Sequence, residues 1–382
     1  MTNLDDALDV GGPLLVGHTR LPVLGTARIY VCGITPYDTT HLGHAATFVW
    51  ADLAARVLHR AGRSVEVCRN ITDVDDDLLA QARERRVSWR SLATQQAYRF
   101  ERDMDDLGIA HPTYEPRSHD HVDGVIALVE ELLVRGAAYE RRGSVYFRGG
   151  EVYRRAGLTR DEALAVAAQR GGRPDDPDKD EPLDAALWVP STGGDPAWES
   201  PWGLGRPGWH AECTAMALTT FGPTVDLHAG GDDLAFPHHA YEAAQAETFT
   251  GVRPFARAWM HVGAVRVAGT KMAKSTGNLV FVRDLLERWS PAAIRLLILE
   301  RPFAQPWDFD EAQLDVAAAG VESLRSAESR PGGSPAASEE AARALRDNLD
   351  VPRALAVARE ARGATMGGLV RLLGLRYDEK WW

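Results

Sequence analysis

Two histidines that flank a glycine stand where a helix is expected to begin. His41 and His44 enclose Gly43, after a short apolar run and a Thr-Pro turn and before an Ala- and Leu-rich segment. The first N–H groups of a helix lack partners within the helix and carry partial positive charge, so a phosphate binds well there. Two imidazoles at this place favour a phosphate-binding site. The alternative is that the two histidines have no function and are simply exposed or packed in the core.

A second polar cluster lies far along the chain, in a stretch between two glycines. It consists of Lys271, Met272, Ala273, Lys274 and Ser275. A lone Lys-x-x-Lys string is ordinarily a solvated basic loop. In this order, however, the histidine and lysine clusters together resemble the two signature sequences of class I aminoacyl-tRNA synthetases, with Ala273 where that family more often has serine.

The resemblance implies how these residues are used. In the family, paired histidines and a mobile lysine loop stabilise the charge on the triphosphate of ATP while a carboxylate attacks the α-phosphate. His41, His44, Lys271 and Lys274 are therefore expected to be catalytic. Asp233 is expected to hold the ribose, although a Gly-Gly-Asp-Asp string is elsewhere just a turn. The expected residues for ATP, which would bind with Mg²⁺, are Gly43, Gly230, Gly231, Asp233, Lys271, Met272, Lys274 and Ser275.

The composition limits the class of protein. The chain has 382 residues, of which 45% are apolar and 25% charged, so it is long enough for two or three domains with a large core. A net charge of −11 gives no diffuse attraction to nucleic acid, although a local basic groove is compatible with it. No apolar run reaches the ~20 residues that a bilayer span needs, and the N-terminus is acidic where a secretion signal is basic. A cytoplasmic protein without a membrane partner is expected.

Alternating strands and helices are expected to position these residues. Each run of apolar, β-branched residues ends in turn residues before a helical segment begins. Strands are expected at 27–33, 64–69, 224–227 and 256–262, and helices at 43–60, from residue 78 and at 238–248. This alternation is typical of an α/β fold with a doubly wound, Rossmann-type parallel sheet.

Shifts in composition divide the chain into regions. We expect an N-terminal extension at 1–26, a catalytic domain at 27–310 and a reduced C-terminal helical region at 311–382. Residues 90–200 are expected to form an insertion between the halves of the sheet, with helices at 90–107 and 119–135, a hairpin at 138–148 and a polar surface loop at 171–180. A Ser-, Pro- and Gly-rich break at 326–338 is followed by 44 residues, which suffice for two or three short helices.

Four further motifs narrow the resemblance. They are similar to motifs of cysteinyl-tRNA synthetases and of their relative, the mycothiol-pathway cysteine ligase, and they occur in the same order, which chance does not readily produce. The resemblance extends from about residue 27 to 315. The motifs are Tyr30–Gly33, Asn70–Asp76, Gly205–Cys213 and Phe236–His239.

The resemblance also gives two of the three cysteines a role. Cys32 and Cys213, with His238 and Glu242 four residues apart on one face of an expected helix, could surround one metal ion. Such a set suits Zn²⁺, one per chain, and the structural alternative is that both cysteines are small buried apolar residues. Cys68 lies outside any matching motif and is assigned to packing. The three cysteines do not indicate a disulfide framework.

A zinc ion in the amino-acid pocket would separate cysteine from serine, which an apolar pocket distinguishes poorly. The metal lowers the pKa of a thiol and binds the thiolate, an option that the poorly acidic serine hydroxyl lacks. In the family the metal thus selects the substrate and does not attack it. Thr35 and Trp209 match positions that hold the amino group of cysteine and the side of its pocket, although a Trp beside a His is by itself more often core.

The resemblance therefore implies an enzyme that activates cysteine. ATP and cysteine would give cysteinyl adenylate and pyrophosphate, and an amine would then attack the acyl carbon and release AMP. The 73 residues from Asp310 to Trp382 leave no room for an anticodon-reading domain, and the segment Thr35–Thr47 is more like the ligase. We therefore predict an ATP-dependent, tRNA-independent ligase that joins cysteine to a small amine, with glucosaminyl-inositol as the first candidate acceptor.

Other features favour other interpretations. Glu242, with Trp259–His261 and Pro306–Phe309, is closer to the synthetases, since the ligase usually lacks a carboxylate at this position. The alternatives are a divergent ligase with another amine acceptor, a truncated synthetase-like enzyme that acylates tRNA or a carrier protein, and an inactive paralogue with a binding role. The last is disfavoured because the histidines, the lysines and the metal set are intact. A monomer is favoured, and the sequence does not identify the general base of the transfer step.

Overall fold

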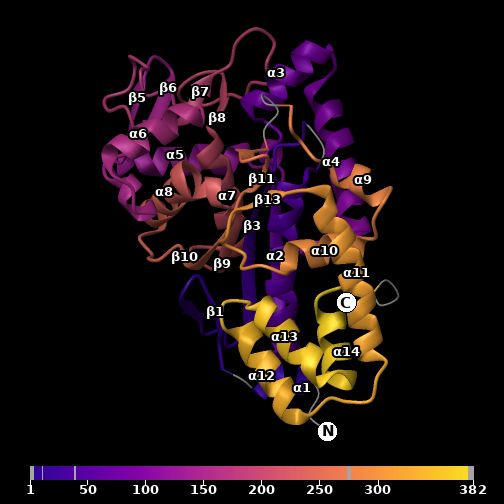
Figure 1. Cartoon of the computed structure of the whole chain (residues 1–382). Helices are drawn as coiled ribbons and strands as arrows, with labels where there is room; N and C mark the ends of the chain where they lie inside the picture. The colour runs from indigo at the N-terminus through magenta and orange to yellow at the C-terminus, as the bar shows by residue number, and fades with distance from the viewer. Residues whose placement is uncertain (1–3, 11, 38–39, 273–276, 377–382) are drawn as a thin grey trace.

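A four-stranded parallel sheet lies at the centre of the molecule (Figure 1). The computed structural model describes residues 4–10, 12–37, 40–272 and 277–376. The sheet has the order β10-β9-β3-β4, and each neighbouring pair runs parallel. Its strands are β3 (Thr26–Ile34), β4 (Ser64–Ile71), β9 (Val225–Gly231) and β10 (Ala256–Val262). The predicted α/β fold with a doubly wound parallel sheet is confirmed.

Helices cover both faces of this sheet. Helix α2 (Leu42–Arg60) packs in the main core with Val31 of β3. The next residue of the strand, Cys32, belongs instead to a cluster with α7 (Trp209–Phe221) and α8 (Ala240–Thr250). Because successive side chains of a strand point to opposite faces, α7 and α8 lie across the sheet from α2.

The segment between β4 and α7 contributes a second core. An antiparallel sheet of order β5-β6-β7-β8 packs there with α5, whereas Phe100 and Met104 of α4 belong to the main core. The predicted loop at 171–180 contains neither helix nor strand. The elements of this segment are α3 (Asp76–Arg85), α4 (Trp89–Asp106), η1 (Ser118–Asp120), α5 (Val122–Val134), β5 (Ala138–Arg141), β6 (Ser144–Phe147), η2 (Val152–Ala156), α6 (Arg160–Gln169), β7 (Ala185–Pro190) and β8 (Gly205–Pro207).

Short elements and a helical region complete the chain. After β9 come η3 (Asp232–Leu234) and η4 (Ala235–His239), and β11 (Val265–Val267) pairs with β12 (Thr270–Lys271) and β13 (Trp307–Phe309). The helices that follow are α9 (Val282–Leu286), α10 (Pro291–Leu299), α11 (Glu311–Glu328), α12 (Pro335–Arg346), α13 (Val351–Ala361) and α14 (Gly363–Leu372). In the described parts of the chain, we find no helix with the length and apolar character that a membrane crossing requires.

The two ends of the chain pack together. Helix α1 (Leu4–Val10) contacts α12 and α14, and it is followed by a two-stranded sheet of β1 (Leu14–Val16) and β2 (Thr19–Leu21). The expected break at 326–338 is wrong in extent, because only residues 329–334 lie between α11 and α12. The hydroxyl of Ser334 accepts a hydrogen bond from the N–H of Ala337 and Pro335 takes the first helical position, so the polar residues start a helix early.

A buried charge network joins the sheet region to the C-terminal helices. Asp52 of α2 accepts hydrogen bonds from Arg56 and Arg295, both at 2.8 Å, and its side chain is 1% exposed. Arg295 also donates to the backbone oxygens of Leu373 and Leu107. Removal of the carboxylate would leave the buried guanidinium group of Arg295 without this counter-charge.

We expect Asp52→Ala to lower the free energy of unfolding by about 3–5 kcal/mol, the usual cost of breaking a buried ion pair from one side. Urea denaturation followed by circular dichroism measures it. The matched control is Glu131→Ala, which breaks an exposed ion pair with Arg135 and should cost less than about 1 kcal/mol. Equal losses in the two variants would show that the Asp52 network does not hold the helices together.

Candidate active site

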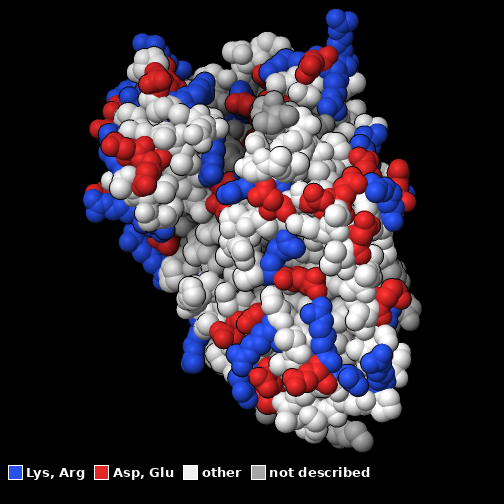
Figure 2. Space-filling view, in the orientation of Figure 1, with Lys and Arg blue, Asp and Glu red and all other residues white. Residues whose placement is uncertain are grey.

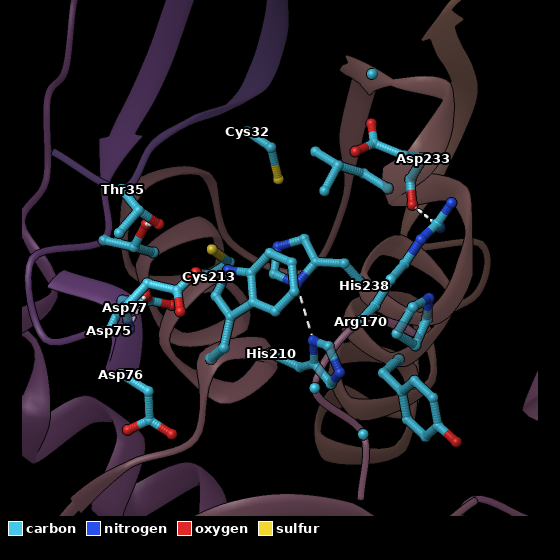
Figure 3. A pocket seen from close by; sticks show the side chains of 18 of the residues that line it. Cys32, Thr35, Asp75, Asp76, Asp77, Arg170, His210, Cys213, Asp233 and His238 are labelled. Atoms are coloured by element: carbon cyan, nitrogen blue, oxygen red, sulfur yellow. Dashed lines mark hydrogen bonds between the residues drawn. The ribbon is translucent and has the colours of Figure 1, made fainter. Parts of the chain in front are cut away.

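A cavity of about 930 Å³ opens at the carboxyl ends of β3, β4 and β9, where ligands bind in doubly wound folds (Figure 3). The loop 170–184 of the second core forms one wall, and Figure 2 shows the hollow between the two upper lobes. Gly230 and Glu242 do not line it, and Lys274 and Ser275 lie outside the described residues. The predicted site residues that line it are Cys32, Thr35, His41, Gly43, His44, Trp209, Cys213, Gly231, Asp233, His238, Lys271 and Met272.

The paired histidines stand at the first turn of α2. His41 precedes the helix, and its Nδ1 accepts hydrogen bonds from the N–H groups of Gly43 and His44 at 3.1 and 3.3 Å. The two rings stack with their centroids 3.8 Å apart. A Cβ at residue 43 would lie 2.9 Å from the ring of His41, which explains the glycine. Because Nδ1 accepts, Nε2 of a neutral His41 carries the proton and can donate to a ligand.

Both histidines are neutral at pH 7. Burial lowers the pKa of His41 well below its usual value, and His44 and Lys271 act in the same direction. Burial also lowers the pKa of His44 to about 4, which the carboxylate of Asp233 offsets only in part. Nδ1 of His44 has no hydrogen-bond partner in the described part of the chain. The pair can therefore donate hydrogen bonds to phosphate oxygens, while the fixed positive charge comes from lysine.

Lys271 forms an ion pair with Asp233, which also lines the cavity. Nζ of Lys271 lies 2.5 Å from Oδ2 of Asp233. Burial acts to raise the pKa of Asp233, but the ammonium group and its hydrogen bond outweigh burial, so the pKa is lowered. Arg170 donates to the backbone oxygens of Asp233 and Phe236 and fixes the turn after β9. The carboxylate of Asp233 is therefore ionised and faces the cavity from a fixed turn.

The two residues predicted to hold cysteine flank the thiols. The hydroxyl of Thr35 lies 3.0 Å from that of Thr72 on the neighbouring strand end. The ring of Trp209 stacks on that of His238 with centroids 4.1 Å apart. Both side chains line the same cavity as Cys213. The structure thus brings together all the described candidates for the amino-acid pocket.

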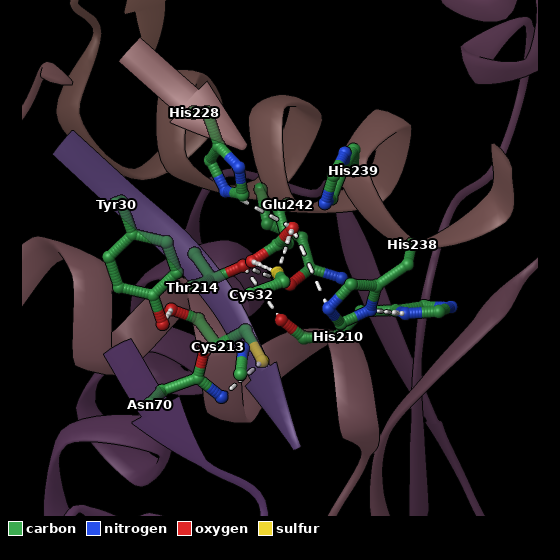
Figure 4. Close-up of polar contacts among 12 residues, drawn as sticks. Tyr30, Cys32, Asn70, His210, Cys213, Thr214, His228, His238, His239 and Glu242 are labelled. Atoms are coloured by element: carbon green, nitrogen blue, oxygen red, sulfur yellow. Dashed lines mark hydrogen bonds and ion pairs between the residues drawn. The ribbon is translucent and has the colours of Figure 1, made fainter. Parts of the chain in front are cut away.

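Four buried side chains converge at the base of the cavity (Figure 4). Cys32, Cys213, His238 and Glu242 each offer one ligand atom, and these atoms all lie within 4.8 Å of one another. Sγ of Cys32 is 3.7 Å and Nε2 of His238 is 3.6 Å from Oε2 of Glu242. Two sulfurs, one nitrogen and one oxygen form a donor set that suits a tetrahedral metal site. The group could bind a metal ion.

The surroundings of this group orient its donors. Nδ1 of His238 is hydrogen-bonded to Nδ1 of His210 at 2.8 Å, which leaves Nε2 directed at Glu242. The amide of Asn70 donates to Sγ of Cys213 at 3.3 Å. Burial raises the pKa of the Cys213 thiol to about 11 and that of the Cys32 thiol well above its usual value. Thiolates at this depth need a cation beside them, which a metal ion would provide.

A second set of donors, missed by sequence reasoning, shares two of these residues. His228 and His239 also converge with Cys32 and Glu242. His228 is fully buried on β9, with Nε2 3.5 Å from Oε2 of Glu242, and neither ring nitrogen forms a hydrogen bond within the described residues. The only sequence signal was a histidine within an apolar strand. Of this second set only Cys32 lines the cavity, whereas three members of the first set do.

Comparison with known proteins identifies the family of this chain. Residues 22–319 match the family model of the tRNA synthetases class I (C) catalytic domain. The chain belongs to this family. The predicted resemblance, from about residue 27 to 315, is thereby confirmed. Among solved structures of class I synthetases, the chain is similar to Mycobacterium tuberculosis methionyl-tRNA synthetase in complex with methionyl-adenylate, with a TM-score of 0.65, 18% identity and coverage of 92% of this chain and 82% of that one. At this identity the likeness shows the fold alone.

Curated relatives of this class I family member are more similar to it. The chain is 43% identical to an L-cysteine:1D-myo-inositol 2-amino-2-deoxy-alpha-D-glucopyranoside ligase of Thermomonospora curvata, over 92% of this chain and 89% of the relative. It is 45% identical to the ligase of the same name from Streptomyces coelicolor, over 86% of this chain and 82% of the relative. These relatives are ligases that are named for cysteine and an aminosugar glycoside.

Proposed function

We propose that the protein is an ATP-dependent ligase that forms cysteinyl adenylate and transfers the cysteinyl group to the amine of an aminosugar such as glucosaminyl-inositol. The observation that carries this proposal is the single cavity that holds both the histidine and lysine groups for a triphosphate and the thiol-rich donor set for a metal. The names of the curated relatives support the choice of cysteine and of the aminosugar.

In the first step the carboxylate of cysteine attacks the α-phosphate of ATP and pyrophosphate leaves. His41 and His44 donate hydrogen bonds to phosphate oxygens at the N-terminus of α2, and Lys271 with Lys274 neutralises the charge that develops on the leaving group. Asp233 leaves Lys271 and accepts hydrogen bonds from the ribose hydroxyls, for which its low pKa keeps it ionised. Mg²⁺ accompanies the ATP.

Zinc is the metal that the donor set suits best, with Cys32, Cys213, His238 and Glu242 as the residues that hold it. Three of the four line the cavity, so a substrate thiol can reach this set, whereas only Cys32 of the set with His228 and His239 lines it. When bound, zinc lowers the pKa of the substrate thiol and accepts its thiolate, which distinguishes cysteine from serine. Thr35 and Trp209 hold the rest of the amino acid.

A synthetase-like enzyme that acylates tRNA or a carrier protein is the second candidate. The observation that favours it is Glu242, because its carboxylate lies among the metal donors as the synthetase pattern requires. On the face shown in Figure 2, however, acidic and basic side chains are interspersed and form no broad basic field of the kind that binds nucleic acid. The aminosugar therefore remains the first candidate acceptor.

We expect the purified protein, given cysteine and ATP, to release AMP in the presence of glucosaminyl-inositol and to form an acid-stable amide. Total tRNA should not stimulate AMP release. Binding of tRNA depends on many contacts between basic side chains and phosphates, and the face in Figure 2 has no broad basic field to provide them. The assay runs both acceptors in parallel and separates amide from base-labile ester by chromatography. An ester on tRNA without an amide product would contradict the proposal and support the synthetase-like alternative.

A further inference from the structure

One wall of the cavity is acidic. Asp75 lies at the start of α3, on the same side of the pocket as Thr35 in Figure 3. Glu212, which precedes Cys213 on α7, lines the same cavity. The carboxyl ends of β3 and β4 are adjacent in the sheet, so the start of α3 lies near the residues proposed to hold cysteine. This wall faces Arg170 and Asp233 across the cavity (Figure 3).

Asp75 differs from the two aspartates that follow it. Asp76 is paired with Arg206, and Asp77 accepts a hydrogen bond from the hydroxyl of Tyr37 at 3.2 Å. Asp75 accepts the N–H of Asp77 at 2.9 Å as the N-cap of α3, and no Lys, Arg or His pairs with it in the described parts of the chain. Its carboxylate is thus fixed in place without a counter-charge.

The electrostatic surroundings keep this carboxylate basic. Burial raises the pKa of Asp75 to about 6, the nearby charges of Asp77 and Asp76 add to the rise, and the N–H of Asp77 opposes it. On helix α7, Glu212 interacts electrostatically with Asp75. A carboxylate with a pKa near 6 is ionised at pH 7 and still accepts a proton readily.

Glu212 gives an independent sign of a ligand. The residue is 1% exposed, and the hydroxyl of Ser118 donates to its Oε2 at 2.7 Å. Its Oε1 has no hydrogen bond from any described residue, although the side chain lines the cavity. This oxygen is not fully buried, so it is open to the cavity and can accept a hydrogen bond from a ligand.

We infer that Asp75 is the general base of the transfer step and that Glu212 accepts a hydrogen bond from the same acceptor amine. The inference rests on the proposed function. In the transfer step the neutral amine nitrogen forms a bond to the acyl carbon of cysteinyl adenylate. The bond from that carbon to the phosphate oxygen breaks, and AMP leaves with its electron pair. The nitrogen then carries one proton too many, which passes to Oδ2 of Asp75 and from there to water.

The test separates the two half-reactions of the zinc-loaded protein. We expect Asp75→Asn to leave cysteine-dependent exchange of pyrophosphate into ATP near the wild-type rate, and to slow amide formation from preformed cysteinyl adenylate and glucosaminyl-inositol about 10²-fold. Asparagine caps helices as well as aspartate does, so α3 should remain folded. The matched control is Asp310→Asn, which makes the same change at the N-cap of α11 outside the cavity lining, and it should transfer at the wild-type rate.

The pH profile distinguishes a base from a structural role. Below pH 6 the transfer rate of the wild type should fall about 100-fold per pH unit, because both the amine and Asp75 become protonated, whereas Asp75→Asn should fall only about 10-fold per unit. Normal transfer by Asp75→Asn, or an unchanged slope, would overturn the inference and leave the proposed function intact. A wild type that activates cysteine but forms no amide would overturn both.

Discussion

Replacement of Cys213 by serine is expected to remove the metal and, with it, the activation of cysteine. The hydroxyl is a poor ligand for zinc, and Cys213 contributes one of only two sulfurs to the donor set. We expect zinc to fall from about one per chain to nearly none, and cysteine-dependent pyrophosphate exchange to fall by at least about 10³-fold, since the pocket loses the group that recognises the thiol. Metal analysis by mass spectrometry and the exchange assay measure the two effects, and serine should not become a substrate.

Two control variants make this result specific. Cys68→Ser introduces the same chemical change at a fully buried cysteine outside both donor sets, and it should retain the metal and the exchange activity. His228→Gln alters only the second donor set and should also retain the metal. Loss of zinc in His228→Gln together with full zinc in Cys213→Ser would reassign the site to the second set.

The sheet and its helices were predictable because their signals are local. The apolar runs of β3 and β10 end in turn residues, and the expected strand at 256–262 agrees in its bounds with β10. The ends of helices depend on single capping residues. Ser334 caps α12 and Pro335 takes its first position, so the helix begins inside the break that was expected at 326–338. Strand ends and helix caps of this kind can be predicted from a few neighbouring residues.

The site was predictable only where a motif identified it. Three members of the first donor set lie in motifs, and the fourth, Glu242, lies four residues after His238. The ligand atoms of all four converge in the structure. His228 carries no such signal, because it lies in an apolar strand. Asp75 lies within the motif Asn70–Asp76, but it is one of three consecutive aspartates and the sequence does not distinguish it from the other two. Their surroundings arise from the packing of α7 and α8 against the ends of β4 and β9, which no local pattern encodes. The same reason explains why the general base could not be identified from the sequence.

His44→Ala is expected to slow cysteine-dependent pyrophosphate exchange by about 10²–10³-fold, the usual effect of removing one donor aimed at developing charge. His44 lies in the first turn of α2, where it is half-buried and its ring stacks on that of His41, and its N–H lies 3.3 Å from Nδ1 of His41. Its backbone role survives the substitution, because alanine keeps the N–H. The loss should therefore appear in the rate of exchange and not in the folding of α2, which circular dichroism checks.

The low pKa of His44 makes this prediction specific to a neutral imidazole. With a pKa of about 4 the ring is uncharged from pH 6 to 8, so exchange should not rise as the pH falls through 6.5. A rise over this range that is present in the wild type and absent in His44→Ala would show that the imidazolium ion acts instead. His44→Gln, which keeps a donor, should recover part of the rate. The matched control is His121→Ala. His121 is part-buried, hydrogen-bonded to the backbone oxygen of Arg117 and outside the cavity lining, so this variant should exchange at the wild-type rate. A loss at His44 alone then reports on the phosphate site.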